Sequence, residues 1–254
     1  MASGTLTVDA FLGGQLRLAQ PEAGHRAGLD AVMLAAAAPV VAGQRVLDAG
    51  SGMGVVGLCI ARRVPGCHVT GIEVDPSLAA LAGENAKINE LSDRYRALSG
   101  DLTGPLSHIE TLGPKRDSFH VVVSNPPFYG AGRGSVSLEP AKHRAGVMPE
   151  GGLEDWIRFM TTMTSPGGTL VLIHQAAALG EILALLDGRC GAAKVYPLFP
   201  RAGEPAHRIL VSARKGSRAG LTLRQGMVLH GDGNQFTDEA EAVLRHGAAI
   251  TLSK

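Results

Sequence analysis

The ten residues from Asp48 to Gly57 read DAGSGMGVVG, and they follow a short apolar run that is typical of a β-strand. Read from Gly52, the segment satisfies G-x-G-x-x-G, a pattern whose glycines let the backbone turn tightly from a strand into a helix beside a nucleotide. In a nicotinamide-binding loop the first glycine follows the strand directly, because the helix N-terminus must receive a pyrophosphate. Here Asp48 ends the strand instead. Its carboxylate would repel a phosphate and attract an ammonium group.

Acidic residues also mark the ends of the next two expected strands. Glu73 closes the run 68–73, and Asp101 follows the run 95–99. At one edge of a parallel sheet, Glu73 can accept two hydrogen bonds from ribose hydroxyls and Asp101 can accept one from an adenine amino group. A ligand with an ammonium group, a ribose and an adenine but no phosphate is S-adenosylmethionine. This is the expected cofactor, and its expected binding residues are Asp48, Gly50, Gly52, Gly54, Glu73 and Asp101.

A second motif, Asn125-Pro126-Pro127-Phe128, follows the apolar run 120–124. Two prolines lack N–H groups and keep the backbone extended, so carbonyl groups stay free at the end of the strand. The Asn125 amide oxygen and the Pro126 carbonyl can accept hydrogen bonds from an amino group whose lone pair is delocalised, and Phe128 offers a face on which a planar substrate can stack. Asn125, Pro126, Pro127 and Phe128 are therefore the expected acceptor site, and Asn125 is also assigned to the cofactor-binding set.

Short β-branched runs alternate with longer stretches rich in alanine and leucine, which is the pattern of an α/β protein. This pattern predicts seven strands, mostly parallel, with helices on both faces of the sheet. The expected strands are 45–49, 68–73, 95–99, 120–124, 169–174, 194–196 and 208–213, and the expected helices within this unit are 55–63, 76–89, 153–163 and 176–186.

Two flanking segments lie outside the predicted sheet. Residues 1–44 contain a polar lead and an expected helix over 30–42 that packs on the cofactor site, and residues 214–254 suggest a small hairpin followed by a helix over 238–245. Neither segment is long enough to form an independent domain. The expected organisation is one core over 45–213 with two extensions.

The composition excludes several other classes of protein. The chain has 254 residues, of which 45% are hydrophobic and 19% charged, and its 34 glycines do not have the period of collagen. The three cysteines are widely spaced and form no metal-ligand pair, so no metal site is expected. The longest apolar run is too short to span a bilayer, and the N-terminus lacks the pattern of a secretory signal. We expect a soluble cytoplasmic protein without a membrane partner.

With both motifs in view, the chain resembles the class I S-adenosylmethionine-dependent methyltransferases that carry an N-P-P-[YF] motif. It is most similar to the tRNA (adenine-N6) methyltransferase family that acts beside the anticodon of a valine tRNA. The resemblance implies a Rossmann-like seven-stranded sheet whose last strand is antiparallel, and it adds Asp30 to the cofactor pocket. It covers segment 24–34, the glycine loop, Glu73, Gly100-Asp101, the acceptor motif and segment 205–210. Phe128 stands where many adenine-N6 enzymes have tyrosine, and phenylalanine also occurs in guanine-N2 enzymes.

The expected contact with RNA is a basic segment near the C-terminus. The formal net charge of the whole chain is only +1, so attraction for a polyanion must come from a local patch. The segment 201–224 carries six basic residues and one acid, which leaves a local charge of +5 that could follow phosphates. Its members are Arg201, Glu204, Arg208, Arg214, Lys215, Arg218 and Arg224, and Lys142, His143 and Arg144 could add a second basic rim beside the acceptor site.

Four functions are compatible with parts of this pattern. Methylation of an RNA base amino group, with adenine N6 of tRNA as the first choice and guanine N2 as a variant, uses every motif. A protein glutamine amide is an alternative acceptor, but enzymes of that kind carry a helical N-terminal domain, whereas only 47 residues precede Asp48. Asp48 and the N-P-P-F segment disfavour a nicotinamide-dependent oxidoreductase. A cofactor-binding module without catalysis is the fourth possibility.

Overall fold

The computed structural model describes residues 5–22, 26–130, 147–148 and 152–252. Its central sheet contains all seven predicted strands, in the order β10-β11-β9-β6-β3-β4-β5. Six of them run in the same direction, while β11 lies antiparallel to both of its neighbours, β9 and β10, which confirms the expected class I arrangement. The bounds are β3 (Arg45–Ala49), β4 (His68–Glu73), β5 (Tyr95–Ser99), β6 (Phe119–Ser124), β9 (Thr164–Gln175), β10 (Cys190–Phe199) and β11 (Arg208–Lys215).

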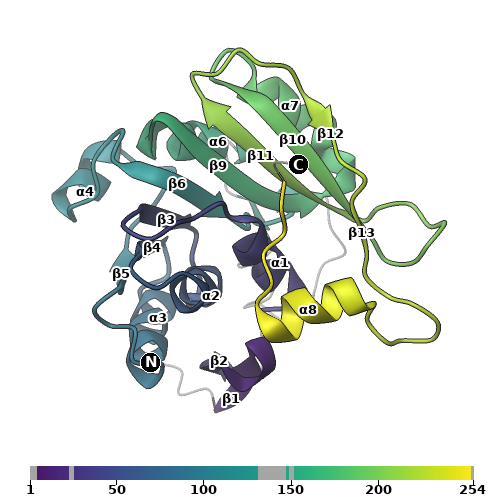
Figure 1. The fold of residues 1–254 in the computed structure, drawn as a ribbon. Coiled ribbons are helices and arrows are strands. Elements are labelled where there is room, and N and C mark those ends of the chain that lie inside the picture. Colours follow the sequence, from purple (N-terminus) through teal and green to yellow (C-terminus); the bar gives the residue numbers. More distant parts are fainter. Residues whose placement is uncertain (1–4, 23–25, 131–146, 149–151, 253–254) are drawn as a thin grey trace.

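Helices cover both faces of this sheet, as predicted (Figure 1). Alternate residues of the buried strands face opposite layers: Val121 and Val123 pack into one core, and Val122 packs into the other. The first core is shared with α1 (Leu29–Ala37), α2 (Val55–Arg63), α3 (Pro76–Ile88) and α8 (Asp238–His246). The second core is shared with α4 (Leu106–Thr111), which was not predicted, α6 (Gly152–Met163) and α7 (Leu179–Leu186).

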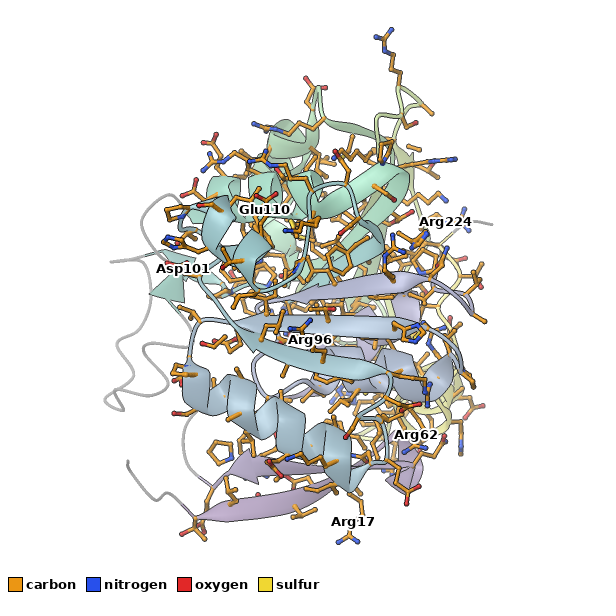
Figure 2. The ribbon with its side chains drawn as sticks, turned by 90° about the vertical axis from the view of Figure 1, so that its left-hand side faces the viewer. Arg17, Arg62, Arg96, Asp101, Glu110 and Arg224 are labelled. Carbon is orange, nitrogen blue, oxygen red and sulfur yellow. The ribbon has the colours of Figure 1, made fainter. Side chains whose placement is uncertain are left out.

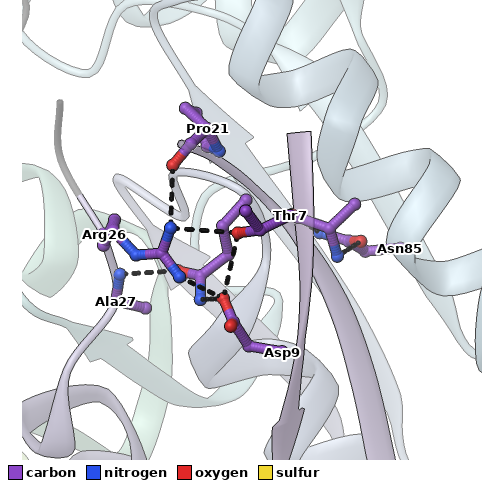
Figure 3. Close-up of polar contacts among 8 residues, drawn as sticks. Thr7, Asp9, Pro21, Arg26, Ala27 and Asn85 are labelled. Atoms are coloured by element: carbon purple, nitrogen blue, oxygen red, sulfur yellow. Dashed lines mark hydrogen bonds and ion pairs between the residues drawn. The ribbon is translucent and has the colours of Figure 1, made fainter. Parts of the chain in front are cut away.

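The N-terminal segment contains a hairpin that the sequence did not predict. Strands β1 (Leu6–Phe11) and β2 (Leu16–Pro21) pair antiparallel around the short 3-10 turn η1 (Leu12–Gly14). Arg26 holds the open end of this hairpin through hydrogen bonds to Asp9, Thr7 and the Pro21 carbonyl (Figure 3). On the other side, Asn85 of α3 exchanges hydrogen bonds with the backbone of Ala19 and donates one to the Met53 carbonyl at 3.0 Å. Asn85 thereby ties the hairpin to the glycine loop.

Some predicted bounds were wrong for local reasons. Helix α1 ends at Ala37 rather than at residue 42, because Pro39 disfavours the helical conformation of Ala38, which is extended (φ −69°, ψ 119°). Strand β9 begins at Thr164 rather than at residue 169, because residues 164–168 form an additional, bulged part of the strand. The predicted helix 176–186 is divided into the 3-10 turn η2 (Ala176–Ala178) and α7.

In the C-terminal segment after β11, the antiparallel pairing among the described residues is limited to one bridge between His230 and Phe236, and the two short strands of this segment join the central sheet instead. Strands β12 (Thr222–Leu223) and β13 (Met227–Val228) do not pair with each other; each pairs in parallel with the open edge of β10, so the sheet has nine strands among the described residues. Gly226 allows this close approach, because its φ is +83° and an added Cβ would lie 2.3 Å from the Pro197 carbonyl oxygen. The short pair β7 (Tyr129–Gly130) and β8 (Val147–Met148) stands apart from the sheet.

Candidate active site

The glycine loop is held by the neighbouring strand β4. The amides of Gly50 and Ser51 both donate to the Ile72 carbonyl, at 2.9 and 3.0 Å, and the Gly54 amide donates to the Ser51 carbonyl at 2.8 Å. Gly50, Gly52 and Gly54 all have positive φ, which only glycine adopts at little cost. An added Cβ would meet no atom within 4 Å at Gly52, whereas at Gly50 it would strike the Trp156 ring. The loop therefore turns tightly and leaves open space beside Gly52.

Asp48 lies beneath the loop and is fully buried. Its Oδ2 accepts a hydrogen bond of 2.9 Å from the Gly57 amide in α2, while Oδ1 has no partner among the described residues. Burial raises the pKa of Asp48 to about 7, the Gly57 hydrogen bond opposes this shift, and the nearby Glu73 carboxylate adds to it. Asp48 thus fixes the start of α2 against β3. Direct contact with a cofactor ammonium group stays a prediction.

Glu73 and Asp101 lie at the carboxyl ends of adjacent strands, as predicted. Glu73 is 9% exposed; its Oε2 accepts from the Gly52 amide at 2.8 Å, and its Oε1 accepts from the Asp75 amide at 3.0 Å. Asp101 is exposed, and its Oδ1 accepts from the amide and hydroxyl of Thr103, each at 2.8 Å. Figure 2 shows Asp101 on the opposite side of the view from Arg62, which lies in the last turn of α2. Both carboxylates keep lone pairs for further donors.

A hydrogen-bonded pair joins the glycine loop to the acceptor motif. Ser124, the last residue of β6, donates from Oγ to the Ala49 carbonyl at 2.7 Å, and Trp156 Nε1 donates to Ser124 Oγ at the same distance. Ala49 directly precedes Gly50, and Ser124 directly precedes Asn125. Neither Ser124 nor Trp156 was predicted from the sequence, although Trp156 is the single tryptophan of the chain and lies in the amphipathic helix α6.

The acceptor motif follows β6 at the same sheet edge as the glycine loop. Pro126 is buried, and the Asn125 side chain is partly exposed as a whole, yet its Oδ1 is buried and has no hydrogen-bond partner among the described residues. Buried amide oxygens are normally paired, so an unpaired one beside a binding loop indicates a site for a donor from a ligand. The role predicted for Asn125, which is to accept a hydrogen bond from the amino group of a substrate, stays a prediction.

Two side chains that were not predicted to lie in the acceptor site contact the ring of Phe128. The Arg208 guanidinium carbon lies 4.6 Å from the centroid of the Phe128 ring, and the His174 ring lies 5.1 Å away at an interplanar angle of 73°. Arg208 Nε also donates to Asp30 Oδ2 at 3.0 Å. Asp30 was predicted to line the cofactor pocket; its observed partner is this arginine on β11.

The six cations of segment 201–224 do not form one patch, so that part of the RNA prediction was wrong. Arg208 and Arg214 stand at opposite ends of β11, paired with Gln175 and Thr169, which separates them by about 20 Å at the usual rise of a strand. Several of the cations are already hydrogen-bonded within the protein: Arg201 to Gly231 and Gly233, Arg214 to Gly167, and Lys215 to Asp117, Thr161 and Thr164. Figure 2 shows Arg224 far from Asp101.

Lys142, His143 and Arg144 lie outside the described residues. Within the described ranges, no group of three or more His, Cys, Asp or Glu side chains is arranged to hold a metal ion, and no helix is long and apolar enough to cross a membrane.

The residues present fit S-adenosylmethionine better than a dinucleotide. Segment 48–57 contains no lysine or arginine that could neutralise a pyrophosphate. Its surroundings are instead acidic, with Asp48 below the loop and Glu73 bonded to Gly52, and the space beside Gly52 is open. A cationic ligand with a ribose suits such a site.

Comparison with known proteins identifies the family of the chain. The methyltransferase small domain family matches residues 28–142. The tRNA1(Val) (adenine(37)-N6)-methyltransferase of Aeromonas hydrophila is 31% identical over 84% of this chain and 86% of its own length, and that of Porphyromonas gingivalis strain W83 is 36% identical over 70% and 69%. The crystal structure of a predicted O-methyltransferase from Agrobacterium tumefaciens superposes with a TM-score of 0.73 at 30% identity, covering 87% of this chain and 98% of that one. The chain therefore belongs to the family of class I S-adenosylmethionine-dependent methyltransferases that includes these tRNA adenine-N6 enzymes.

Proposed function

We propose that this methyltransferase transfers a methyl group from S-adenosylmethionine to the exocyclic N6 amino group of an adenine in tRNA. The observation that carries the proposal is the buried, unpaired Asn125 Oδ1 at the end of β6. The relatives named above support the choice of tRNA, because their names specify adenine 37 of a valine tRNA.

Asn125 would act by orienting the amino group. The lone pair of an adenine amino nitrogen is delocalised into the ring, so the nitrogen is a poor nucleophile in its planar form. Two acceptors, Asn125 Oδ1 and the Pro126 carbonyl, would hold the two amino hydrogens and direct the lone pair toward the methyl group. Phe128 would hold the ring of the base by stacking. When bound, S-adenosylmethionine supplies an electrophilic methyl group on a sulfonium.

The cofactor would bind along the carboxyl edge of β3, β4 and β5. We propose that Glu73 accepts hydrogen bonds from the ribose, that Asp101 accepts one from the adenine, and that Gly50, Gly52 and Gly54 shape the loop beside the methionine part. The remaining lone pairs of Glu73 and Asp101 make this possible. Asp48 would contribute by supporting the loop, and a bound ammonium group would favour its charged form.

The RNA would approach this same edge. Arg201 follows β10 and Arg208 begins β11, so both lie at the carboxyl edge of the parallel strands, whereas Arg214 and Lys215 end β11 at the opposite edge. An unpaired base is the favoured target, because it reaches a pocket at a lower unstacking cost than a base in a duplex.

Methyl transfer from tritiated S-adenosylmethionine tests the proposal directly. The purified protein would be given an unmodified valine tRNA transcript, the same transcript with guanine in place of adenine 37, total ribosomal RNA, and a protein fraction. We expect incorporation into the first transcript, loss of incorporation with the guanine substitution, and recovery of N6-methyladenosine after digestion. Incorporation only into ribosomal RNA or protein would overturn the proposed substrate, and a lack of incorporation despite cofactor binding would favour a non-catalytic module.

A further inference from the structure

Three side chains outside the N-P-P-F motif meet at the acceptor edge. Asp30 comes from α1, Arg208 from β11 and His174 from β9. The Asp30–Arg208 ion pair is partly buried, with the two side chains 19% and 30% exposed. His174 is 4% exposed. These elements are far apart in sequence, and the sheet brings them to the ring of Phe128.

Arg208 is held in a defined place. Its Nε bonds Asp30 Oδ2 at 3.0 Å, which fixes the plane of the guanidinium group, and its Cζ lies 4.6 Å from the Phe128 centroid. A cation at this distance from an aromatic face is attracted by the electron-rich ring, more strongly when both groups are partly removed from water. Arg208 therefore restrains Phe128 and occupies one of its two faces.

His174 restrains the same ring from another direction. The two rings make a T-shaped contact, which is a favoured geometry for aromatic pairs. Neither ring nitrogen of His174 has a hydrogen-bond partner among the described residues; the Gln175 backbone lies near it but falls short of hydrogen-bond geometry. Burial lowers the pKa of His174, the nearby Gln175 backbone opposes this shift, and the Arg208 charge adds to it.

We propose that Arg208, anchored by Asp30, is a positioning residue for the acceptor base: it covers one face of Phe128, so that the base stacks only on the opposite face, with His174 fixing the tilt of the ring. This inference rests on the proposed function, and it assigns the Asp30–Arg208 pair to the substrate side of the site. The cofactor contact that the resemblance implies for Asp30 stays a separate prediction.

Kinetics of Arg208 variants test this role. Arg208→Ala should raise the KM for tRNA by roughly 2- to 30-fold, which is the range that a cation–π contact supports, while the Kd for S-adenosylhomocysteine stays within about twofold. Arg208→Lys should recover part of the loss, since it keeps the charge. Arg214→Ala is the matched control, because it removes an arginine from the same strand at the opposite edge of the sheet, and its KM should equal that of the wild type.

A double-mutant cycle with Phe128 separates positioning from ordinary phosphate binding. In a Phe128→Leu background, Arg208→Ala should have little further effect, because the ring on which it acts is gone. If the increase in KM of the double variant equals the product of the increases in the two single variants, Arg208 acts independently of Phe128 and the inference is overturned. An unchanged KM in Arg208→Ala would also overturn it.

A measurement without substrate keeps the inference distinguishable from the proposed function. The chain has six phenylalanines, and the 19F resonance of Phe128 in protein labelled with 4-fluorophenylalanine is assigned by its loss in Phe128→Leu. We expect this resonance to move in Arg208→Ala and Asp30→Asn and to stay unchanged in Arg214→Ala. A resonance unaffected by loss of Arg208 would contradict the positioning role even if tRNA methylation were established, and a shift without any methylation of tRNA would support the geometry while rejecting the substrate.

Discussion

The indole Nε1 of Trp156 donates a hydrogen bond of 2.7 Å to Ser124 Oγ, and the Ser124 hydroxyl in turn donates a hydrogen bond to the Ala49 carbonyl. Ser124 closes the strand that leads to the acceptor motif, and Ala49 closes the strand that leads to the glycine loop. All three residues are buried. Two loops that must meet around one reaction are therefore joined by a single hydroxyl group.

Ser124→Ala should destabilise the protein and weaken both loops. The change leaves the Trp156 N–H and the Ala49 carbonyl buried without this partner, which costs about 1–3 kcal/mol for each unsatisfied group. Urea unfolding should show this loss, and the affinity for S-adenosylhomocysteine should fall with it. Ser118→Ala is the control, because the hydroxyl of the partly exposed Ser118 donates only to the Lys115 carbonyl, and the unfolding free energy should change little. Equal stability of the two variants would contradict the linking role of Ser124.

Gly50→Ala should be far more harmful than Gly52→Ala. Both positions have positive φ. An added Cβ at Gly50 would lie 2.6 Å from the Trp156 ring, whereas an added Cβ at Gly52 would have no atom within 4 Å. The backbone term is about 1 kcal/mol at either glycine, and the clash adds to it only at Gly50. Thermal melting should rank Gly50→Ala well below Gly52→Ala. The same melting temperature for both would show that Trp156 yields without cost.

Glu73→Ala should weaken cofactor binding. Loss of hydrogen bonds to a charged group costs about 1.5–3 kcal/mol each, so we expect the Kd for S-adenosylhomocysteine to rise at least about tenfold. The fluorescence of Trp156, the only tryptophan of the chain, reports binding because its ring lies against the glycine loop. Glu84→Ala, which removes an exposed carboxylate from α3, should leave the Kd unchanged. An unchanged Kd in Glu73→Ala would remove Glu73 from the cofactor site.

The strands and the main motifs could be predicted because each is a local pattern. The run 45–49 and the glycines after it need no distant partner to be recognised. Arg208 and Asp30 could not be paired in advance, since they are brought together by the antiparallel insertion of β11 between β9 and β10. The prediction that segment 201–224 forms one basic patch was wrong for the same reason, because Arg208 and Arg214 lie at opposite ends of β11 and therefore at opposite edges of the sheet. The β1–β2 hairpin was missed although the sequence contains a signal for it, because residues 6–9 and 16–18 alternate apolar and polar side chains on either side of Gly13-Gly14.

Asp48 should make stability depend on pH. Its pKa is raised from 3.8 to about 7 in the folded protein, so the folded state binds more protons than the unfolded state between these values. The contribution of the protonated carboxyl is fully present below pH 4 and is lost as the pH rises through 7. Asp48→Asn should therefore have a flatter stability curve between pH 4 and 7 in urea unfolding. Parallel curves for variant and wild type would show that the Asp48 carboxyl keeps an ordinary pKa.

The most direct test of the account is the turnover of Asn125→Ala with saturating S-adenosylmethionine and unmodified valine tRNA. Loss of one positioned acceptor commonly costs about 3 kcal/mol in the transition state, so kcat should fall roughly a hundredfold, while the Kd for S-adenosylhomocysteine and the melting temperature stay close to those of the wild type. Asn125→Asp, which keeps an acceptor oxygen, should retain more activity than Asn125→Ala. A folded Asn125→Ala enzyme with the wild-type kcat would contradict the claim that the unpaired Asn125 Oδ1 holds the amino group for methyl transfer.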